Sequence, residues 1–280
     1  MANLELRPLS LGEILDRTFS VYRRNFLLFV GITALPQLLV LCLQLVQVFW
    51  SGSGGERRDI SPALGVVAVV GFFIGVIVYL VAHLFAYGGT VYAVSELYLG
   101  RRTSIAASLQ SMRGQAGTLF GVLILNGLAV FAALILFIIP GIYVACRLIT
   151  CVPAALLENL GPRDSLGRSF ALTKDSAGRA FVIYLLYGAL LYGAVLLLEF
   201  PFLFGVALSQ KDPAMLRVWM SLMQVGSFLG TVLVTPILTI ASTVFYYDLR
   251  VRKEAFDLQI MMNPAGTGTL QGAGVPKTLT

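Results

Sequence analysis

Three ionisable residues interrupt long apolar runs of this 280-residue chain: Arg147, Glu199 and His83. Charged groups are costly inside a bilayer, so ionisable residues in apolar segments are the first candidates for a functional site. Arg147 and Glu199 could hold an ion or an anionic headgroup. They could also form a structural ion pair, or Arg147 could extend its guanidinium toward the membrane surface. We favour the structural interpretation, and we expect the two side chains to meet in the outer half of the membrane.

His83 is the one histidine of the chain. A proton relay would need a second titratable group at its depth, and none is visible, so we expect a hydrogen-bonded interior histidine. The sequence carries no nucleotide-binding loop, no Ser/His/Asp set and no carboxylate pair at catalytic spacing. Cys42, Cys146 and Cys151 lie in apolar segments without metal-ligand spacing. We therefore predict no enzyme activity, no cofactor and no metal.

The elements that position these residues are membrane helices. Hydrophobic residues make up 58% of the chain and charged residues 12%, against about a quarter charged in soluble domains. The apolar blocks reach the roughly 20 residues that a bilayer-spanning helix needs. The pattern predicts an all-α, polytopic membrane protein whose single membrane domain covers residues 1–261, followed by a flexible Gly/Thr/Pro-rich tail at 262–280. The six predicted spans are 26–50, 62–99, 117–139, 141–157, 180–208 and 218–247.

Two glycine motifs define expected irregularities. The second span is too long for one crossing, at roughly 57 Å, and the Gly88-Gly89 pair is its expected weak point. Pro140-Gly141 predicts a tight turn between the third and fourth spans. Gly226 and Gly230 have the small-xxx-small spacing that lets helices approach closely, and we expect it to serve packing within the chain.

Basic residues predict the orientation. Of the 20 Lys and Arg residues, 15 fall on one side of the predicted spans, four on the other (Arg57, Arg58, Lys211 and Arg217), and Arg147 lies within a span. Basic residues stay cytoplasmic, so both termini are predicted in the cytoplasm. The net charge of +6 is explained by this flanking pattern rather than by nucleic acid. The predicted partners are the lipid bilayer, anionic lipids at the basic face, and proteins of unknown identity.

An internal repeat divides the chain into three units. Residues 99–109 and 160–170 align without gaps as Leu-Gly-x-Arg-polar-Ser-aliphatic-small-x-Ser-apolar, and the N-terminal stretch offers a weaker third copy. Each copy predicts a short amphipathic helix, at 10–24, 103–113 and 164–175. Ser10 and Glu13 have capping-box spacing. We predict three parallel units, each an amphipathic helix followed by a transmembrane hairpin, around an axis normal to the membrane. The alternative is chance similarity between juxtamembrane segments.

Three acidic residues mark the predicted end of each hairpin: Glu96, Glu158 and Asp248. A carboxylate at a helix C-terminus is unfavourable because the helix dipole is negative there. Arginines lie close to each acid in the sequence, and we expect each acid to pair with one of them at the cytoplasmic junction. The candidates include Arg101, Arg168, Arg250 and Arg252.

Three stretches carry a family resemblance. They are residues 7–26, residues 140–143 with 160–173, and residues 246–258. In this order they resemble bacterial proteins named for the membrane domain of glycerophosphoryl diester phosphodiesterases. The resemblance implies a bacterial inner-membrane location and a membrane domain of unknown role. In that family the phosphodiesterase is a separate soluble barrel that needs histidines and a carboxylate-bound metal, and the single His83 does not fit such a module.

Two functional hypotheses follow. The first is a non-catalytic scaffold or accessory module in an envelope or lipid-related process. The alternative is a transporter or lipid-handling protein with a polar path near Arg147, Glu199 and His83. A continuous polar cavity that reaches mid-membrane would favour transport, and a tightly packed core would favour the scaffold.

Overall fold

A computed structural model describes residues 8–51 and 62–254, and every regular element in these ranges is a helix. Six helical segments are long and apolar enough to cross a membrane, so the chain is an all-α, multi-pass membrane protein. The predicted tail at 262–280 and Arg7, Arg57, Arg58 and Lys277 lie outside the described residues. The helices are α1 (Leu11–Arg24), α2 (Phe26–Ser51), α3 (Pro62–Tyr98), α4 (Ile105–Gln110), α5 (Ala116–Leu136), α6 (Ile138–Arg147), α7 (Cys151–Leu157), α8 (Pro162–Leu172), α9 (Ala177–Leu208) and α10 (Pro213–Glu254).

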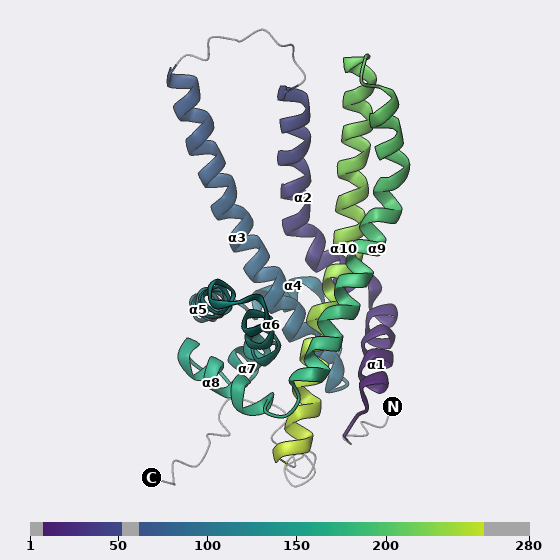
Figure 1. Ribbon diagram of the computed structural model, residues 1–280. Coiled ribbons are helices and arrows are strands. Elements are labelled where there is room, and N and C mark those ends of the chain that lie inside the picture. Colours follow the sequence, from purple (N-terminus) through teal and green to yellow (C-terminus); the bar gives the residue numbers. More distant parts are fainter. Residues whose placement is uncertain (1–7, 52–61, 255–280) are drawn as a thin grey trace.

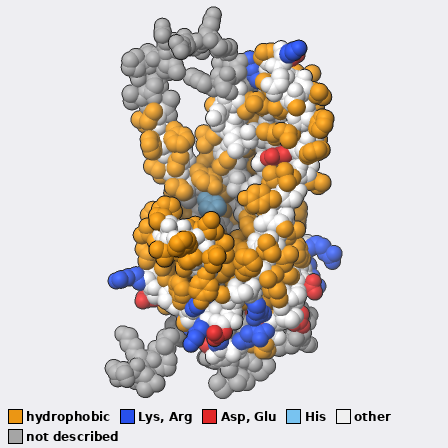
Figure 2. All heavy atoms as spheres, viewed as in Figure 1, with side chains coloured by type: hydrophobic (Ala, Val, Ile, Leu, Met, Phe, Trp, Pro, Cys, Tyr) orange, Lys and Arg blue, Asp and Glu red, His pale blue; other side chains and the backbone are white. Residues whose placement is uncertain are grey.

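Four long helices set the long axis of the molecule. In Figure 1, α2, α3, α9 and α10 run along this axis, whereas α5 and α6 are seen nearly end-on and so lie across it. The short helices α1, α4, α7 and α8 gather at one end, and α2 and α3 spread apart toward the other. Lysine and arginine side chains collect around the first end, which we call the basic end (Figure 2). The opposite end carries the junction between α9 and α10 at residues 209–212.

The three predicted units appear in the order of the elements but not in their orientation. A short helix precedes each apolar pair, with α1 before α2–α3, α4 before α5–α6 and α8 before α9–α10. The middle pair lies across the other two (Figure 1), so the prediction of three parallel hairpins is wrong for this unit. The predicted fourth span is also broken, because α6 ends at Arg147 and α7 begins at Cys151. The break follows from packing, since every residue of α7 up to Leu156 is buried in the core.

The turn between α5 and α6 lies earlier than Pro140-Gly141. Phe137 has extended backbone angles and separates the two helices. Pro140 sits in the first turn of α6, where its missing N–H would have no helical partner in any case. Gly141 packs against α5, since a Cβ there would come within 3.0 Å of the Leu134 Cα. The prolyl-glycyl pair therefore starts a helix and brings it close to its neighbour.

The second apolar block does not break. α3 is one continuous helix through Gly88 and Gly89. A Cβ on Gly89 would lie 3.2 Å from the Ser108 carbonyl oxygen, and one on Gly88 would collide with Met112. The glycine pair is thus the surface against which α4 and the segment after it pack, and α4 is shorter than the predicted 103–113 helix.

The main core lies at the basic end. The short helices α1, α7 and α8 and the ends of α3, α9 and α10 converge there on fully buried aromatic side chains. The Tyr98 and Tyr247 rings stack with centroids 4.7 Å apart, and the Tyr247 hydroxyl shares a 2.7 Å hydrogen bond with Ser95. The tight core therefore joins α3 to α10 near one surface of the membrane domain.

The predicted capping box of α1 is present. The Ser10 hydroxyl accepts the Glu13 N–H at 3.3 Å, and the Glu13 carboxylate accepts the Ser10 N–H at 2.7 Å. Replacing Ser10 with alanine should lower the free energy of unfolding by about 1 kcal/mol, because the Glu13 N–H loses its acceptor. Denaturant titration in detergent measures the change. Ser10→Asp retains an acceptor and should restore most of the stability; equal losses for both variants would contradict the capping role.

Candidate functional site

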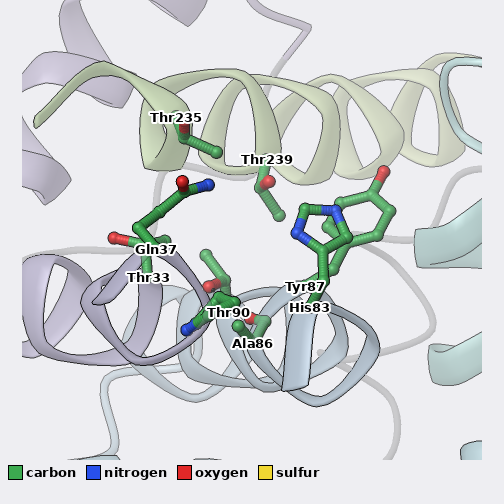
Figure 3. A pocket seen from close by; sticks show the side chains of 9 residues that line it. Thr33, Gln37, His83, Ala86, Tyr87, Thr90, Thr235 and Thr239 are labelled. Carbon is green, nitrogen blue, oxygen red and sulfur yellow. Dashed lines mark hydrogen bonds between the residues drawn. The ribbon is translucent and has the colours of Figure 1, made fainter. Parts of the chain in front are cut away.

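A polar pocket lies at the point where α2 and α3 diverge. The space that a water-sized group can occupy in it is about 20 Å³, which is room for one small polar group such as a hydroxyl or a water molecule. Nine residues from three helices line it (Figure 3): Thr33, Pro36 and Gln37 of α2, His83, Ala86, Tyr87 and Thr90 of α3, and Thr235 and Thr239 of α10. Seven of these side chains carry a hydrogen-bonding group, although all three helices are apolar enough to span a membrane.

Three of the lining groups keep their hydrogen-bonding capacity for the pocket. Within the described residues, the Gln37 amide, the His83 imidazole and the Tyr87 hydroxyl form no hydrogen bond with the protein, and Figure 3 shows Gln37 and His83 facing a common space. His83 stacks on Tyr79 with ring centroids 5.7 Å apart. The expected hydrogen-bonded histidine is therefore not observed. In an apolar medium such groups gain by binding a polar partner.

Two of the four threonines that line the pocket have a structural role. Thr90 donates to the Ala86 carbonyl at 2.7 Å within its own helix. Thr33 hydrogen-bonds the Val232 carbonyl of α10 at 3.3 Å, besides its own helix. Val232 is the residue four positions before Pro236, whose missing N–H leaves that carbonyl without its helical donor. A carbonyl freed by proline is thus occupied by a hydroxyl that joins α2 to α10, not left for a cation.

The pocket is closed toward the basic end. On that side Val91 and Val94 of α3 and Ile240 and Val244 of α10 are fully buried. On the other side α3 is exposed, with Phe72 and Ile74 more than half accessible. Figure 2 shows histidine at the back of a hollow between α3 and the α9–α10 pair, above the apolar α5–α6 hairpin. The pocket is therefore a blind recess that opens sideways.

The chemistry of the lining favours an uncharged polar ligand. No residue lining the pocket carries a fixed charge. An amide, an imidazole and a hydroxyl together donate and accept hydrogen bonds. A phosphate or carboxylate would lose its hydration there without gaining a counter-ion, which is unfavourable. Within the described residues no group of three His, Cys, Asp or Glu side chains could hold a metal ion.

Arg147 lies away from the pocket and from Glu199. Its guanidinium donates to the Thr173 hydroxyl at 3.1 Å, the Tyr143 hydroxyl at 2.8 Å and the Phe170 carbonyl. It thereby caps the C-terminal end of α8 at the basic end. No ion pair joins it to Glu199 anywhere in the described part of the chain, so that predicted pair is wrong. The depth expected for Arg147 assumed that α6 crosses the membrane, whereas α6 lies across the long axis (Figure 1).

Glu199 sits on α9, nine residues before that helix ends at Leu208 near the opposite end. Its side chain is half-buried, and its carboxylate has no hydrogen bond or ion pair with another described residue. The structure thus separates the three ionisable residues singled out from the sequence. Only His83 lies in the pocket.

The three acids at the basic end form the ion pairs expected for them. Glu96 pairs with Arg101 at 2.7 Å, Glu158 with Arg168 at 2.7 Å, and Asp248 with Arg252 at 3.0 Å. Asp248 does not end its helix, because α10 continues to Glu254. Basic residues in the last turn of α10 favour this extension, since cations interact well with the negative end of the helix dipole.

A network around Glu158 joins α7, α8 and α10. The Tyr246 hydroxyl donates to Glu158 at 2.7 Å, and Arg168 bridges Glu158 and Glu254. Arg250 pairs with Glu254 at 3.0 Å. Burial lowers the pKa of the Arg168 guanidinium, but hydrogen bonds to Glu254 and Glu158 outweigh it, so the net pKa shift is upward. These groups are committed to one another and serve alignment of the helices.

Sequence reasoning missed most of the pocket. A signal existed, because Tyr79, His83 and Tyr87 recur every four residues and share one face of α3, as do Thr33 and Gln37 on α2. The sequence alone does not show that these two helix faces meet each other and α10. Comparisons with protein-family models, with curated proteins and with solved structures find no match to this chain.

Proposed function

We propose that this protein is a non-catalytic membrane module that holds the uncharged polar part of a lipid in the pocket between α2, α3 and α10. The uncommitted Gln37, His83 and Tyr87 groups in an apolar surrounding carry the proposal. A lipid fits because its acyl chains can stay in the membrane while a hydroxyl or ester group enters the sideways opening. Such a module would serve an envelope or lipid-related process.

The location belongs to the same proposal. The basic end faces the cytoplasm, both termini lie there, and the membrane is a bacterial inner membrane. The one-sided distribution of Lys and Arg supports this orientation, and the resemblance to membrane domains of glycerophosphoryl diester phosphodiesterases supports the bacterial assignment. Anionic lipids at the basic face remain a proposed partner.

Binding is favoured over transport by the shape of the recess. A transporter needs a polar route that can reach both surfaces. Here Val91, Val94, Ile240 and Val244 close the recess toward the basic end, and Arg147 and Glu199 contribute no path to it. The packed core therefore supports an accessory module that holds a lipid without moving it across.

Photolabelling tests the proposal. The full-length protein in phosphatidylcholine vesicles is exposed to diacylglycerol that carries a photoreactive diazirine, with phosphatidic acid carrying the same group as the charged comparison. Diacylglycerol should label α2 and α3 preferentially. In the Gln37→Leu/His83→Leu double variant this labelling should fall roughly ten-fold or more, because two hydrogen bonds of about 1 kcal/mol each are lost.

Gln44→Leu provides a matched control, since it makes the same change on α2 outside the pocket lining. It should leave labelling unchanged. The double variant should also melt close to the parent, because neither His83 nor Gln37 forms a hydrogen bond with another described residue and leucine can still pack where His83 stacks on Tyr79. Undiminished labelling in the double variant, or stronger labelling by phosphatidic acid, would contradict a neutral lipid site.

A further inference from the structure

The α5–α6 hairpin carries an inference that does not depend on the pocket. Its base is packed in the core, with Leu119, Val122 and Cys146 buried. Its turn is exposed and apolar, with Phe137 72% and Ile139 80% accessible. Between Arg113 and Arg147 the sequence has no charged residue. An apolar turn that is this exposed needs contact with something other than water.

Fixed contacts hold the hairpin across the long axis. Gly121 of α5 packs so closely on α8 that a Cβ would come within 2.8 Å of the Pro162 ring. At the other arm, Arg147 binds the end of α8 through Thr173 and Phe170, and the Ser169 hydroxyl donates to the Arg147 carbonyl at 2.8 Å. Both arms are thereby tied to a helix of the basic end. Rotation onto the long axis would break these contacts.

The depth of the hairpin identifies its surroundings. Figure 2 shows its apolar side chains directly above the charged side chains of the basic end. A layer just inside a belt of basic residues is where the acyl chains of the adjoining leaflet begin. In the turn the N–H groups of Phe137 and Gly141 donate to the carbonyls of Ala133 and Phe137, and Pro140 has none to satisfy. The Ile138 and Ile139 N–H groups donate to no described backbone group, so the turn needs headgroups or water nearby, as there are just inside the basic belt.

We infer that α5 and α6 do not cross the membrane, and that the hairpin lies among the acyl chains of the leaflet at the basic end. Four helices, α2, α3, α9 and α10, then make the crossings. The hairpin is long enough to span, since α5 measures roughly 32 Å, but its attachment to α8 directs it sideways. Its partner is the hydrocarbon of one leaflet.

Spin labels at two depths test the inference in the full chain reconstituted in vesicles. Cysteine replaces Phe137 in the turn or Leu128 in the middle of α5, in a background in which Cys42→Ala removes the exposed thiol. Cys146 and Cys151 stay, because they are buried. Nitroxide relaxation by oxygen and by a water-soluble nickel chelate gives the depth of each label. Gln210→Cys, in the junction at the opposite end, is the aqueous reference.

The expected result is that labels at 137 and 128 lie at the same depth, protected from nickel and relaxed by oxygen. A crossing hairpin would separate them by roughly 13 Å along the membrane normal, and the label at 137 would resemble that at 210; this would overturn the inference. Strong spin–spin broadening at 137 at low protein-to-lipid ratio would also overturn it, by showing that a second copy covers the hairpin. Unchanged melting of the variants would establish that each retains the fold.

Discussion

Replacing Asp248 with alanine should lower the free energy of unfolding by about 3 kcal/mol. The carboxylate is 1% exposed and accepts the Leu9 N–H at 2.7 Å. It also accepts hydrogen bonds from Arg179 at 2.9 Å and Arg252 at 3.0 Å. Alanine would leave two guanidinium groups and one N–H without this acceptor. The expected loss in the free energy of unfolding is at the lower end of the range for breaking a buried ion pair, because both arginines are partly exposed to water.

Reversible denaturation in mixed micelles measures this change. Asp248→Asn keeps the shape and one carbonyl acceptor, so it should lose less than alanine. Asp16→Ala is the matched control, since Asp16 is exposed on α1 and has no hydrogen bond or ion pair with another described residue. It should change stability by about 0.5 kcal/mol or less. Equal effects of Asp248→Ala and Asp16→Ala would show that the buried network contributes nothing.

Gly226→Ala should destabilise the α9–α10 pair by about 1–3 kcal/mol. A Cβ at Gly226 would lie 2.9 Å from the Leu198 carbonyl oxygen, and one at Gly230 would lie 3.2 Å from the Val195 backbone. These neighbours are main-chain atoms, so relief requires the two helices to move apart. The overpacking should outweigh the gain of about 1 kcal/mol that alanine normally brings to a helix over glycine.

Gly193→Ala tests whether the effect is local. Gly193 also lies on α9, but a Cβ there meets no atom within 4 Å. This variant should be neutral or slightly more stable in the same denaturation assay. Gly226→Ala/Gly230→Ala should lose more than Gly226→Ala alone. A stabilising Gly226→Ala substitution would show that α9 and α10 can separate at no cost.

Hydrophobic runs and capping chemistry predicted the helices well because both are local properties. The Ser10–Glu13 capping box and the continuous apolar runs need no knowledge of distant residues. The ion pairs of Glu96, Glu158 and Asp248 were also accessible, since each acid pairs with an arginine at most ten residues away. The additional pairing of Asp248 with Arg179 joins α10 to α9 and had no local signal.

The orientation of α5–α6 could not be predicted from hydropathy or charge. A helix in lipid is apolar on all sides whether it crosses the membrane or lies within one leaflet. The count of basic residues does not distinguish the two orientations of the hairpin either, because the turn at Phe137–Ile139 carries no charge. Four or six crossings therefore give the same distribution of Lys and Arg. The prediction that Arg147 lies beside Glu199 failed for this reason, because the depth of Arg147 was counted along a span that was assumed to cross the membrane.

The contacts of Leu9 have a mechanical consequence. Its N–H binds Asp248, and its carbonyl accepts hydrogen bonds from Arg179 and Arg252. The first described residues and the last turns of α10 are thus joined into a closed loop of chain. A pulling force applied between Leu9 and the last turns of α10 would act on these hydrogen bonds before it acts on any helix.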